Sequence, residues 1–211
     1  AIGDVLAALE ETGQRKNTLI LFTSDNGPWI NNPKGGGYPN NTPLLNYSQP
    51  SDLRGRKCDV WEGGIHVPGF MNWPGHIKSQ EVEEVVHIVD WFPTLASLIE
   101  FAPREAIAWD GSDLCPVLFD RDPLGERDLY WIWNTRVNRW ALRHGDWKIV
   151  RYSKKGPTKA SDWQLYNLKK DPGERDNVAA SCSEIVAELH QLYVHQQNKD
   201  RKAKWSKPTG E

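Results

Sequence analysis

Two adjacent oxygen-bearing side chains, Asp25 and Asn26, follow directly after a short apolar run in this chain. The run, Thr18–Phe22, has the length of one buried strand, and in open α/β sheets the ligand-binding groups gather beyond the carboxyl ends of the strands. Neighbouring carboxylate and carbonyl oxygens suit a hard divalent cation such as Ca²⁺ or Mg²⁺. The alternative is turn chemistry, because Asn26 and Gly27 readily adopt positive φ. Taken alone, the pair fits either a cation site or a turn.

A second passage concentrates positive charge on a glycine-rich backbone. Arg54, Arg56 and Lys57 surround Gly55 and stand just ahead of the predicted strand Val67–Trp73. Such a backbone allows close approach of an oxyanion, while ammonium or guanidinium groups neutralise its charge. The alternative is a solvated basic turn.

Tryptophan is unusually frequent, with 11 in 211 residues. Aromatic faces stack on sugar rings, and Trp29, close behind the Asp25–Asn26 pair, is the best placed for a substrate contact. Most of the others are expected to be core or half-buried packing residues, above all those at near-alternating strand positions, namely Trp131, Trp133, Trp140 and Trp147.

Three motifs follow one another in the first part of the chain, namely Asp25-Asn-Gly-Pro28, Leu53-Arg-Gly-Arg-Lys57 and Trp61-Glu-Gly-Gly64. Together they resemble the type I sulfatase family, in its arylsulfatase and glycosaminoglycan-sulfatase branch. The resemblance continues through Val89–Ala96, Asp110–Ser112, Trp140–Lys148 and Trp163–Glu174, and so covers nearly the whole chain.

The resemblance implies an α/β fold: the carboxy-terminal part of an alkaline-phosphatase-like α/β sandwich, plus a small antiparallel sheet with a terminal helix. The implied activity is hydrolysis of a sulfate ester, from a sulfated carbohydrate or an aryl sulfate, to an alcohol and inorganic sulfate. Asp25 and Asn26 match a late pair of calcium ligands, and Lys57 matches a lysine contacting the substrate sulfate. Fixed positive charge is what the negative charge developing on a sulfate ester requires. Arg54 and Arg56 remain open between a sulfated ligand and pairing with acids such as Asp52 or Asp59.

The chain departs from the family at the nucleophile, a cysteine or serine in Cys/Ser-x-Pro-x-Arg that matures to formylglycine. None of Cys58, Cys115 and Cys182 has a proline two places on and an arginine four places on. The nucleophile, the early aspartates of the calcium site and the active-site histidines are expected in an amino-terminal part of the same protein. The chain is therefore predicted to be a fragment that is inactive alone, and the family implies a secreted, periplasmic or lysosomal parent.

Two other functions remain open. A phosphatase or phosphodiesterase of the same superfamily would share Asp-Asn metal ligation, and a non-catalytic sulfoglycan-binding remnant would use Lys57, the arginines and Trp29. The basic passage and the Trp-Glu-Gly-Gly turn favour the sulfatase branch.

The expected elements of the first part follow from periodicity. An amphipathic helix over Ala1–Gly13 leads into the strand Thr18–Phe22, as in an α/β repeat of a parallel sheet. A long loop, Gly27–Pro50, precedes the basic passage, and its length suggests a functional insertion. A strand over Gly69–Trp73 and a helix over Val89–Glu100 follow. His87, just ahead of this helix, is expected to pack or to cap.

Beyond Arg127, short aromatic and β-branched runs separated by turn signals predict an antiparallel sheet. The runs are Leu129–Trp133, Arg139–Arg143, Trp147–Tyr152 and Gln164–Leu168. A helix capped by Ser183 should run to Tyr193, and a disordered tail should start at Gln196. The predicted domains are 1–110 (catalytic α/β part), 111–195 (sheet and helix) and 196–211 (polar tail).

Composition mainly excludes functions. A net charge of −2, from 26 basic and 28 acidic residues, argues against a nucleic-acid-binding surface. No apolar run reaches the roughly 18 residues of a transmembrane helix. Three cysteines do not make a disulfide framework.

Overall fold

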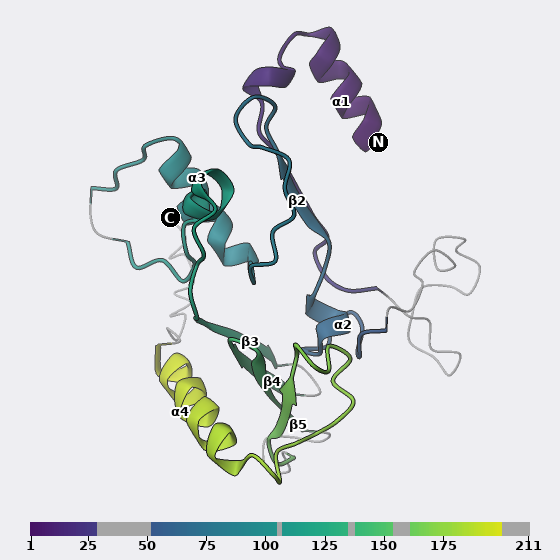
Figure 1. The fold of residues 1–211 in the computed structure, drawn as a ribbon, viewed down its shortest axis with the longest axis vertical. Helices are drawn as coiled ribbons and strands as arrows, with labels where there is room; N and C mark the ends of the chain where they lie inside the picture. The colour runs from purple at the N-terminus through teal and green to yellow at the C-terminus, as the bar shows by residue number, and fades with distance from the viewer. Residues whose placement is uncertain (29–51, 105–106, 135–137, 154–160, 200–211) are drawn as a thin grey trace, which may run out of the picture. The chain divides into compact units, whose positions relative to one another are not determined.

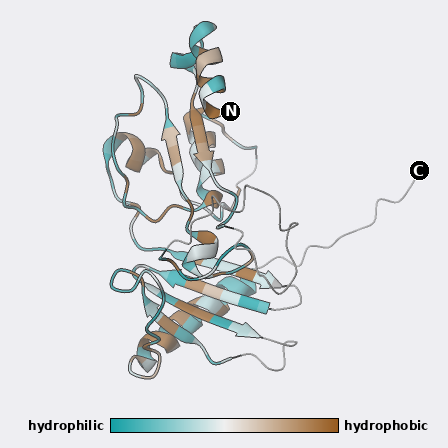
Figure 2. Ribbon diagram, turned by 90° about the vertical axis from the view of Figure 1, so that its right-hand side faces the viewer, coloured by the Kyte–Doolittle hydropathy of each residue, from teal (hydrophilic) through white to brown (hydrophobic). Residues whose placement is uncertain are grey.

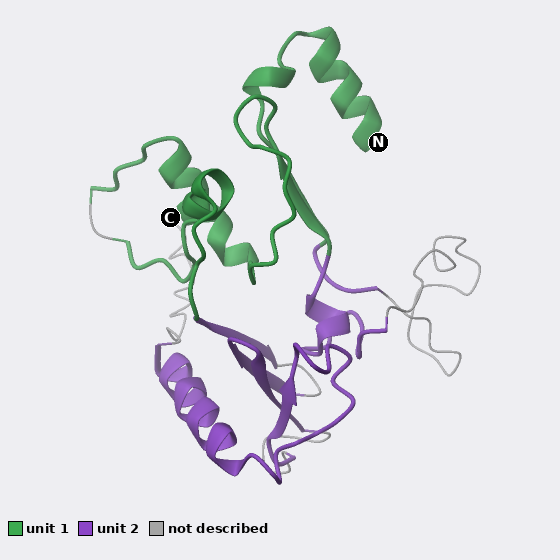
Figure 3. Ribbon diagram, in the orientation of Figure 1, with its two compact units in different colours: residues 1–24, 68–126 green, residues 25–67, 127–211 purple. Residues whose placement is uncertain are grey.

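The computed structural model of the chain describes residues 1–28, 52–104, 107–134, 138–153 and 161–199 (Figure 1). The chain divides into two compact units, residues 1–24 with 68–126 and residues 25–67 with 127–211 (Figure 3). Segment 25–67, which holds both candidate passages, therefore groups with the carboxy-terminal sheet in the second unit. The domain limits expected from the sequence stay a prediction.

The first unit begins with helix α1 (Ile2–Glu11), the short turn η1 (Arg15–Asn17) and strand β1 (Ile20–Thr23). Gly13, at φ 70°, turns the chain out of α1, as predicted. Strand β2 (Gly69–Asn72) pairs with β1 from Ile20↔Asn72 to Thr23↔Gly69. This pairing is antiparallel. The sequence predicted a parallel sheet, but among the described residues the neighbour of β1 is the antiparallel strand β2.

The rest of the first unit is organised around a buried aspartate. Helix η3 (Ile88–Asp90) leads into α3 (Trp91–Leu98), and η4 (Pro116–Asp120) follows. His87 caps η3, since its Nδ1 accepts from the Val89 amide (3.3 Å) and its own amide donates to Asp90 (2.6 Å). Asp90 also accepts from the Ser112 amide at 2.9 Å. A side chain at Gly111 would lie 2.1 Å from the Val89 carbonyl oxygen, which explains the glycine in Asp110–Ser112.

The second unit is a four-stranded antiparallel sheet with one long helix. The strands are β3 (Asp128–Asn134), β4 (Asn138–His144), β5 (Trp147–Ser153) and β6 (Gln164–Asn167), in the order β3-β4-β5-β6. This confirms the predicted sheet. Helix α4 runs over Ser183–Lys199, so the expectation of a disordered tail from Gln196 is wrong for Gln196–Lys199.

The two faces of this sheet are covered differently. On one face, Leu142, Ile149 and Leu165 pack against Leu189 and Tyr193 of α4. The other face carries Ala141, Val150 and Tyr166, which pack against Val60 and Trp61. Strand residues alternate between the faces, and Figure 2 shows apolar and polar positions interspersed along the strands. The sheet therefore separates α4 from the passage that carries the basic residues.

The tryptophan predictions hold for three of the four strand positions. Trp131 packs against the core face beside Val60 and Trp61, and Trp140 and Trp147 pack on the α4 side. Trp133 is 37% exposed, because it lies near the end of β3, and it does not belong to either core cluster.

Candidate functional site

Three backbone segments of the second unit are hydrogen-bonded to one another at glycines. The Gly27 amide donates to the Gly64 carbonyl (2.9 Å), the Lys57 amide to the Pro28 carbonyl (3.0 Å) and the Gly63 amide to the Arg54 carbonyl (2.6 Å). We call segments 25–28, 54–59 and 61–65 the glycine junction. It brings the Asp25–Asn26 passage beside the backbone of Lys57.

The glycines of the junction leave no room for a side chain. A Cβ would lie 1.8 Å from the Gly63 carbonyl oxygen at Gly27, 2.6 Å from the Arg54 oxygen at Gly63, and 2.5 Å from the Asp59 oxygen at Gly64. Gly63 and Gly64 lie in the short helix α2 (Glu62–Ile65), which follows the basic turn. The Gly-Gly pair of the Trp-Glu-Gly-Gly motif is therefore required by close backbone approach.

The junction presents the candidate metal ligands at a bend. Asp25 is exposed and Asn26 is half-buried, and one residue, Ser24, separates them from the end of β1. Among the described residues, no group of three or more histidine, cysteine or acidic side chains is arranged to hold a metal ion. Calcium takes about 6 to 8 oxygen ligands, so Asp25 and Asn26 would form only part of such a site.

The basic side chains differ in their surroundings. Lys57 is half-buried, within a turn in which the Asp59 amide donates to the Arg56 carbonyl at 2.9 Å, and Arg56 is exposed. Trp29, the predicted sugar contact, lies outside the described residues. The functional roles of these side chains stay predictions.

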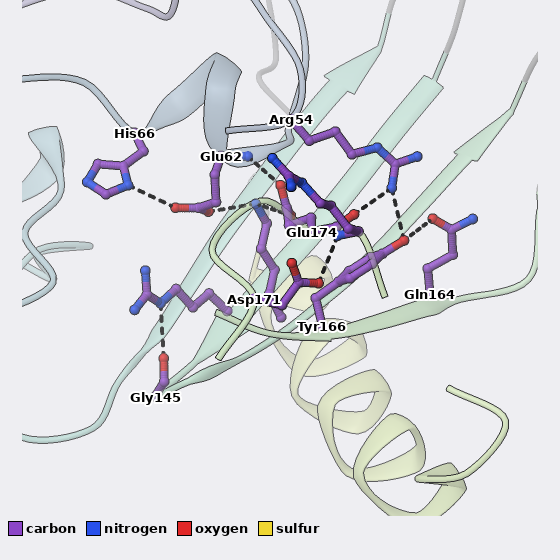
Figure 4. A network of polar contacts seen from close by, with 11 residues as sticks. Arg54, Glu62, His66, Gly145, Gln164, Tyr166, Asp171 and Glu174 are labelled. Atoms are coloured by element: carbon purple, nitrogen blue, oxygen red, sulfur yellow. Dashed lines mark hydrogen bonds and ion pairs between the residues drawn. The ribbon is translucent and has the colours of Figure 1, made fainter. Parts of the chain in front are cut away.

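Arg54 is exposed, yet its guanidinium contacts other groups of the protein. Its guanidinium lies 3.7 Å from the centroid of the Trp61 ring and donates to the Tyr166 hydroxyl (3.1 Å) and the Glu174 carbonyl (3.0 Å) (Figure 4). Arg54 thus connects the segment that carries Lys57 with strand β6 and with Glu174, through cation–π stacking on Trp61 and two hydrogen bonds. Asp59, one of the acids considered for Arg54, pairs instead with Arg139 at 3.0 Å.

A buried ionic cluster is formed by Glu62 of the glycine junction together with Lys148 and Glu174. Figure 4 labels its two carboxylates. The Lys148 ammonium, with no exposed surface, lies 2.8 Å from Glu62 Oε1 and 2.9 Å from Glu174 Oε1. The Glu62 amide donates to Glu174 Oε2 at 2.7 Å. His66 Nδ1 lies 3.3 Å from Glu62 Oε2 at the exposed side of the cluster. A buried ammonium thus bridges two buried carboxylates.

The pKa values of the two carboxylates in the cluster are shifted in opposite directions. Burial alone would raise the pKa of Glu62, but the hydrogen bond with His66 and the Lys148 charge outweigh it and lower this pKa to about 2. At Glu174, burial dominates over the attraction of Lys148 and raises the pKa. The hydrogen bond to Glu62 raises the pKa of His66, against the opposing effect of burial. Glu62 is therefore ionised at neutral pH.

The sequence analysis did not identify this cluster, although its members lie in three of the family motifs. Glu62 belongs to Trp-Glu-Gly-Gly, Lys148 to Trp140–Lys148 and Glu174 to Trp163–Glu174. Only Trp-Glu-Gly-Gly carries a single charge, whereas the other two motifs each hold several charged residues, so the sequence did not single out Lys148 or Glu174. Burial and pairing depend on segments distant in sequence, so no local pattern revealed them.

The raised pKa of His66 predicts a pH-dependent stability. The folded protein holds this proton more tightly than the unfolded chain, so the contribution is present below the ordinary histidine pKa of about 6.5 and is lost as the pH rises through the folded value. We expect the melting temperature to fall between about pH 6 and pH 8, and to fall less in His66→Gln. Parallel melts of both proteins across this range measure the difference, and identical pH profiles would contradict it.

Two family models match this chain. The model described as Sulfatase matches residues 1–101, and the model described as N-sulphoglucosamine sulphohydrolase, C-terminal, matches residues 56–199. Together they cover both units and every segment of the glycine junction.

Similar proteins agree with the family models. The chain is 29% identical to the N-acetylgalactosamine-6-O-sulfatase of Bacteroides thetaiotaomicron, covering 90% of this chain and 38% of that protein. It is 33% identical to the arylsulfatase J of Mus musculus, covering 90% of this chain and 36% of that protein. The chain therefore spans about two fifths of the length of these relatives.

A solved structure supports the fold. A protein described in work on the metabolism of multiple glycosaminoglycans by Bacteroides thetaiotaomicron superimposes with a TM-score of 0.76 at 28% identity, over 93% of this chain and 42% of that one. This likeness confirms the predicted alkaline-phosphatase-like α/β fold class. Because the carboxy-terminal family model matches residues 56–199, more than half of the chain, the chain belongs to the sulfatase family.

Proposed function

We propose that this chain is the carboxy-terminal part of a sulfatase, an enzyme that hydrolyses a sulfate ester to an alcohol and inorganic sulfate. The observation that carries the proposal is the glycine junction, in which the Asp25–Asn26 passage and the Lys57 turn are hydrogen-bonded to each other. These two passages hold the oxygen ligands and the cation that binding a sulfate group requires. Membership of the sulfatase family supports the same reaction.

Lys57 is proposed to contact the sulfate. Sulfur–oxygen bond cleavage increases the negative charge on the oxygens around sulfur, and a fixed ammonium group stabilises that charge more than it stabilises the substrate. Arg56, exposed in the same turn, is proposed to contact a second anionic group of the substrate. Trp29 is proposed as a contact for the substrate's ring.

The cofactor of the proposed enzyme is calcium. Asp25 would supply a carboxylate and Asn26 an amide oxygen, and the remaining ligands would come from outside the described residues. A bound calcium ion would neutralise charge on the sulfate oxygens. The nucleophile, a formylglycine, is proposed to lie in an amino-terminal part of the same protein, so this chain alone is expected to be inactive.

The proposed substrate is a sulfated carbohydrate. The names of an N-acetylgalactosamine-6-O-sulfatase relative and of a structure from glycosaminoglycan metabolism support this class over aryl sulfates, which would serve as artificial substrates. Among the described residues, no helix is long and apolar enough to cross a membrane. A secreted, periplasmic or lysosomal location stays a prediction.

The proposal is tested on the full-length parent, produced with a formylglycine-generating enzyme. Release of inorganic sulfate from an aryl sulfate and from sulfated saccharides is measured by ion chromatography, beside phosphate release from the matching phosphate esters. We expect sulfate release to dominate. Preferred phosphate release would identify a phosphatase, and saccharide binding without hydrolysis would identify a binding protein.

Removal of the metal gives a separate prediction. Chelation of the parent enzyme with excess EGTA is expected to lower sulfate release by at least roughly 10-fold, because the sulfate would lose a divalent charge. Added Ca²⁺ should restore the wild type but restore Asp25→Ala only at much higher concentration. The measurement is activity against free Ca²⁺. An Asp25→Ala titration curve that overlays the wild type would remove Asp25 from the metal site.

A further inference from the structure

We propose that Arg139 of strand β4 is a positioning residue that fixes the turn carrying Lys57. The inference rests on the proposed function, because it concerns how Lys57 is held for the sulfate. Arg139 is 82 positions away from Lys57 in the chain (139 minus 57). It belongs to none of the family motifs named in the sequence analysis.

The turn that carries Lys57 contains a strained residue. Cys58 follows Lys57 directly and has φ 72°, in the left-handed region that residues other than glycine rarely adopt. Such a conformation persists only where surrounding contacts determine it. The Arg56–Asp59 hydrogen bond closes the turn but leaves the Cys58 carbonyl oxygen to accept from elsewhere.

Arg139 supplies contacts to both residues that follow Lys57. Its Nη1 donates to the Cys58 carbonyl oxygen at 2.6 Å, and its Nε lies 3.0 Å from Asp59 Oδ1. The two side chains are only 25% and 16% exposed, so water competes weakly for the pair. The planar guanidinium holds a carbonyl and a carboxylate at once, which a lysine in its place would do poorly.

The backbone of Arg139 is held in the sheet, and the other side of the Lys57 turn lies against helix α2. Strand β4 lies between β3 and β5, where Arg139 pairs with Trp133 and Tyr152. Opposite, Gly64 lies so close that a Cβ there would be 2.5 Å from the Asp59 oxygen. The turn is therefore held between the sheet, through Arg139, and helix α2.

The expected consequence is specific to Lys57. Without Arg139, the turn can relax from the strained φ at Cys58, and the Lys57 ammonium moves away from the sulfate. Displacements of about 1 Å in a catalytic group cost up to roughly 100-fold in rate. Arg139→Gln should therefore lower kcat more than it raises KM.

A double-mutant cycle in the full-length parent tests the inference. Sulfate release is measured for the wild type, Arg139→Gln, Lys57→Ala and the double variant, with Arg139→Lys as the conservative replacement. We expect Arg139→Gln to lower kcat/KM by roughly 10- to 100-fold in the wild type and by less than about 3-fold when Lys57 is absent. Arg139→Lys should recover part of the loss. Equal losses in both backgrounds, or no loss in the wild type, would overturn the proposal.

Arg151→Gln is the matched control, since it removes the same charge from the neighbouring strand. Arg151 donates to the Ser161 carbonyl and stacks near Trp140 and Trp163, away from the Lys57 turn. Its activity should stay within about 3-fold of the wild type. Activity in Arg151→Gln as low as in Arg139→Gln would show a general effect on folding and overturn the proposal.

Alkylation of Cys58 provides a readout that does not depend on activity. Cys58, Cys115 and Cys182 are all free thiols, so mass spectrometry compares their labelling rates within one sample. In Arg139→Gln we expect Cys58 to react several-fold faster while Cys115 and Cys182 keep their rates. An unchanged Cys58 rate would overturn the positioning role. A wild-type parent that releases no sulfate would instead defeat the proposed function, with the labelling still reporting on the turn.

Discussion

Replacing Lys57 with alanine is expected to lower kcat/KM for sulfate release by the parent enzyme by roughly 100- to 1,000-fold, the usual cost of removing one group that stabilises transition-state charge. The loss should fall mainly on kcat, because the charge that Lys57 neutralises grows as the bond to sulfur breaks. Steady-state kinetics on an aryl sulfate measure both constants.

Arg56→Ala is the control for Lys57→Ala. It removes the same unit of charge one residue away, from an exposed side chain. It therefore changes the long-range field about as much as Lys57→Ala does, while leaving the Lys57 ammonium in place. On an aryl sulfate with one anionic group, its loss should stay below about 10-fold. Equal losses for the two variants would show that the turn acts through its general field, and Lys57 would lose its proposed role.

Replacing Lys148 with methionine is expected to lower the stability of the protein by about 3 to 5 kcal/mol. The methionine fills a similar volume, but it leaves Glu62 and Glu174 buried together without the cation between them. A domain of this size loses about 2 to 4 °C per kcal/mol, so the melting temperature should fall by roughly 6 to 20 °C. Calorimetry or near-ultraviolet circular dichroism near pH 7 measures the shift.

Two further variants separate this effect from a general loss of charge. Lys169→Met removes a lysine that is 78% exposed and 4.0 Å from Asp146, so its cost should stay within about 0.5 kcal/mol. Adding Glu62→Gln and Glu174→Gln to Lys148→Met should recover part of the loss, because the unpaired buried charges disappear. Lys148→Met as mild as Lys169→Met would mean that the buried cluster contributes little.

Local sequence patterns predicted most elements of the second unit. Strands β3 to β6 are short aromatic and β-branched runs bounded by turn signals, and such runs can be recognised without knowing their partners. Helix α4 was predicted with too early an end. Its last turns have few apolar residues, and Gln196 and Gln197 donate to Asp128 Oδ2 (3.2 Å) and the Tyr193 hydroxyl (3.3 Å). Asp128 belongs to strand β3, so the apolar periodicity of the helix sequence could not reveal this contact.

Strand pairing in the first unit likewise could not be predicted from local sequence patterns. The apolar run at β1 correctly predicted a strand, yet its neighbour β2 lies antiparallel to it. Hydrophobic pattern determines whether a segment is extended, whereas the direction of its neighbour depends on the path of the intervening chain.

The sequence by itself determined the family and most of the strands and helices, and it named Asp25, Asn26 and Lys57 as candidate site residues, because these depend on short motifs and local periodicity. Only the tertiary structure decided that Glu62, Lys148 and Glu174 meet in the interior, that Arg54 stacks on Trp61, and that Arg139 holds the Lys57 turn. The physical reason is that a charged residue in a sequence is expected, by its type alone, to lie in contact with solvent. Its burial becomes favourable only when an opposite charge from a distant segment arrives within hydrogen-bonding distance.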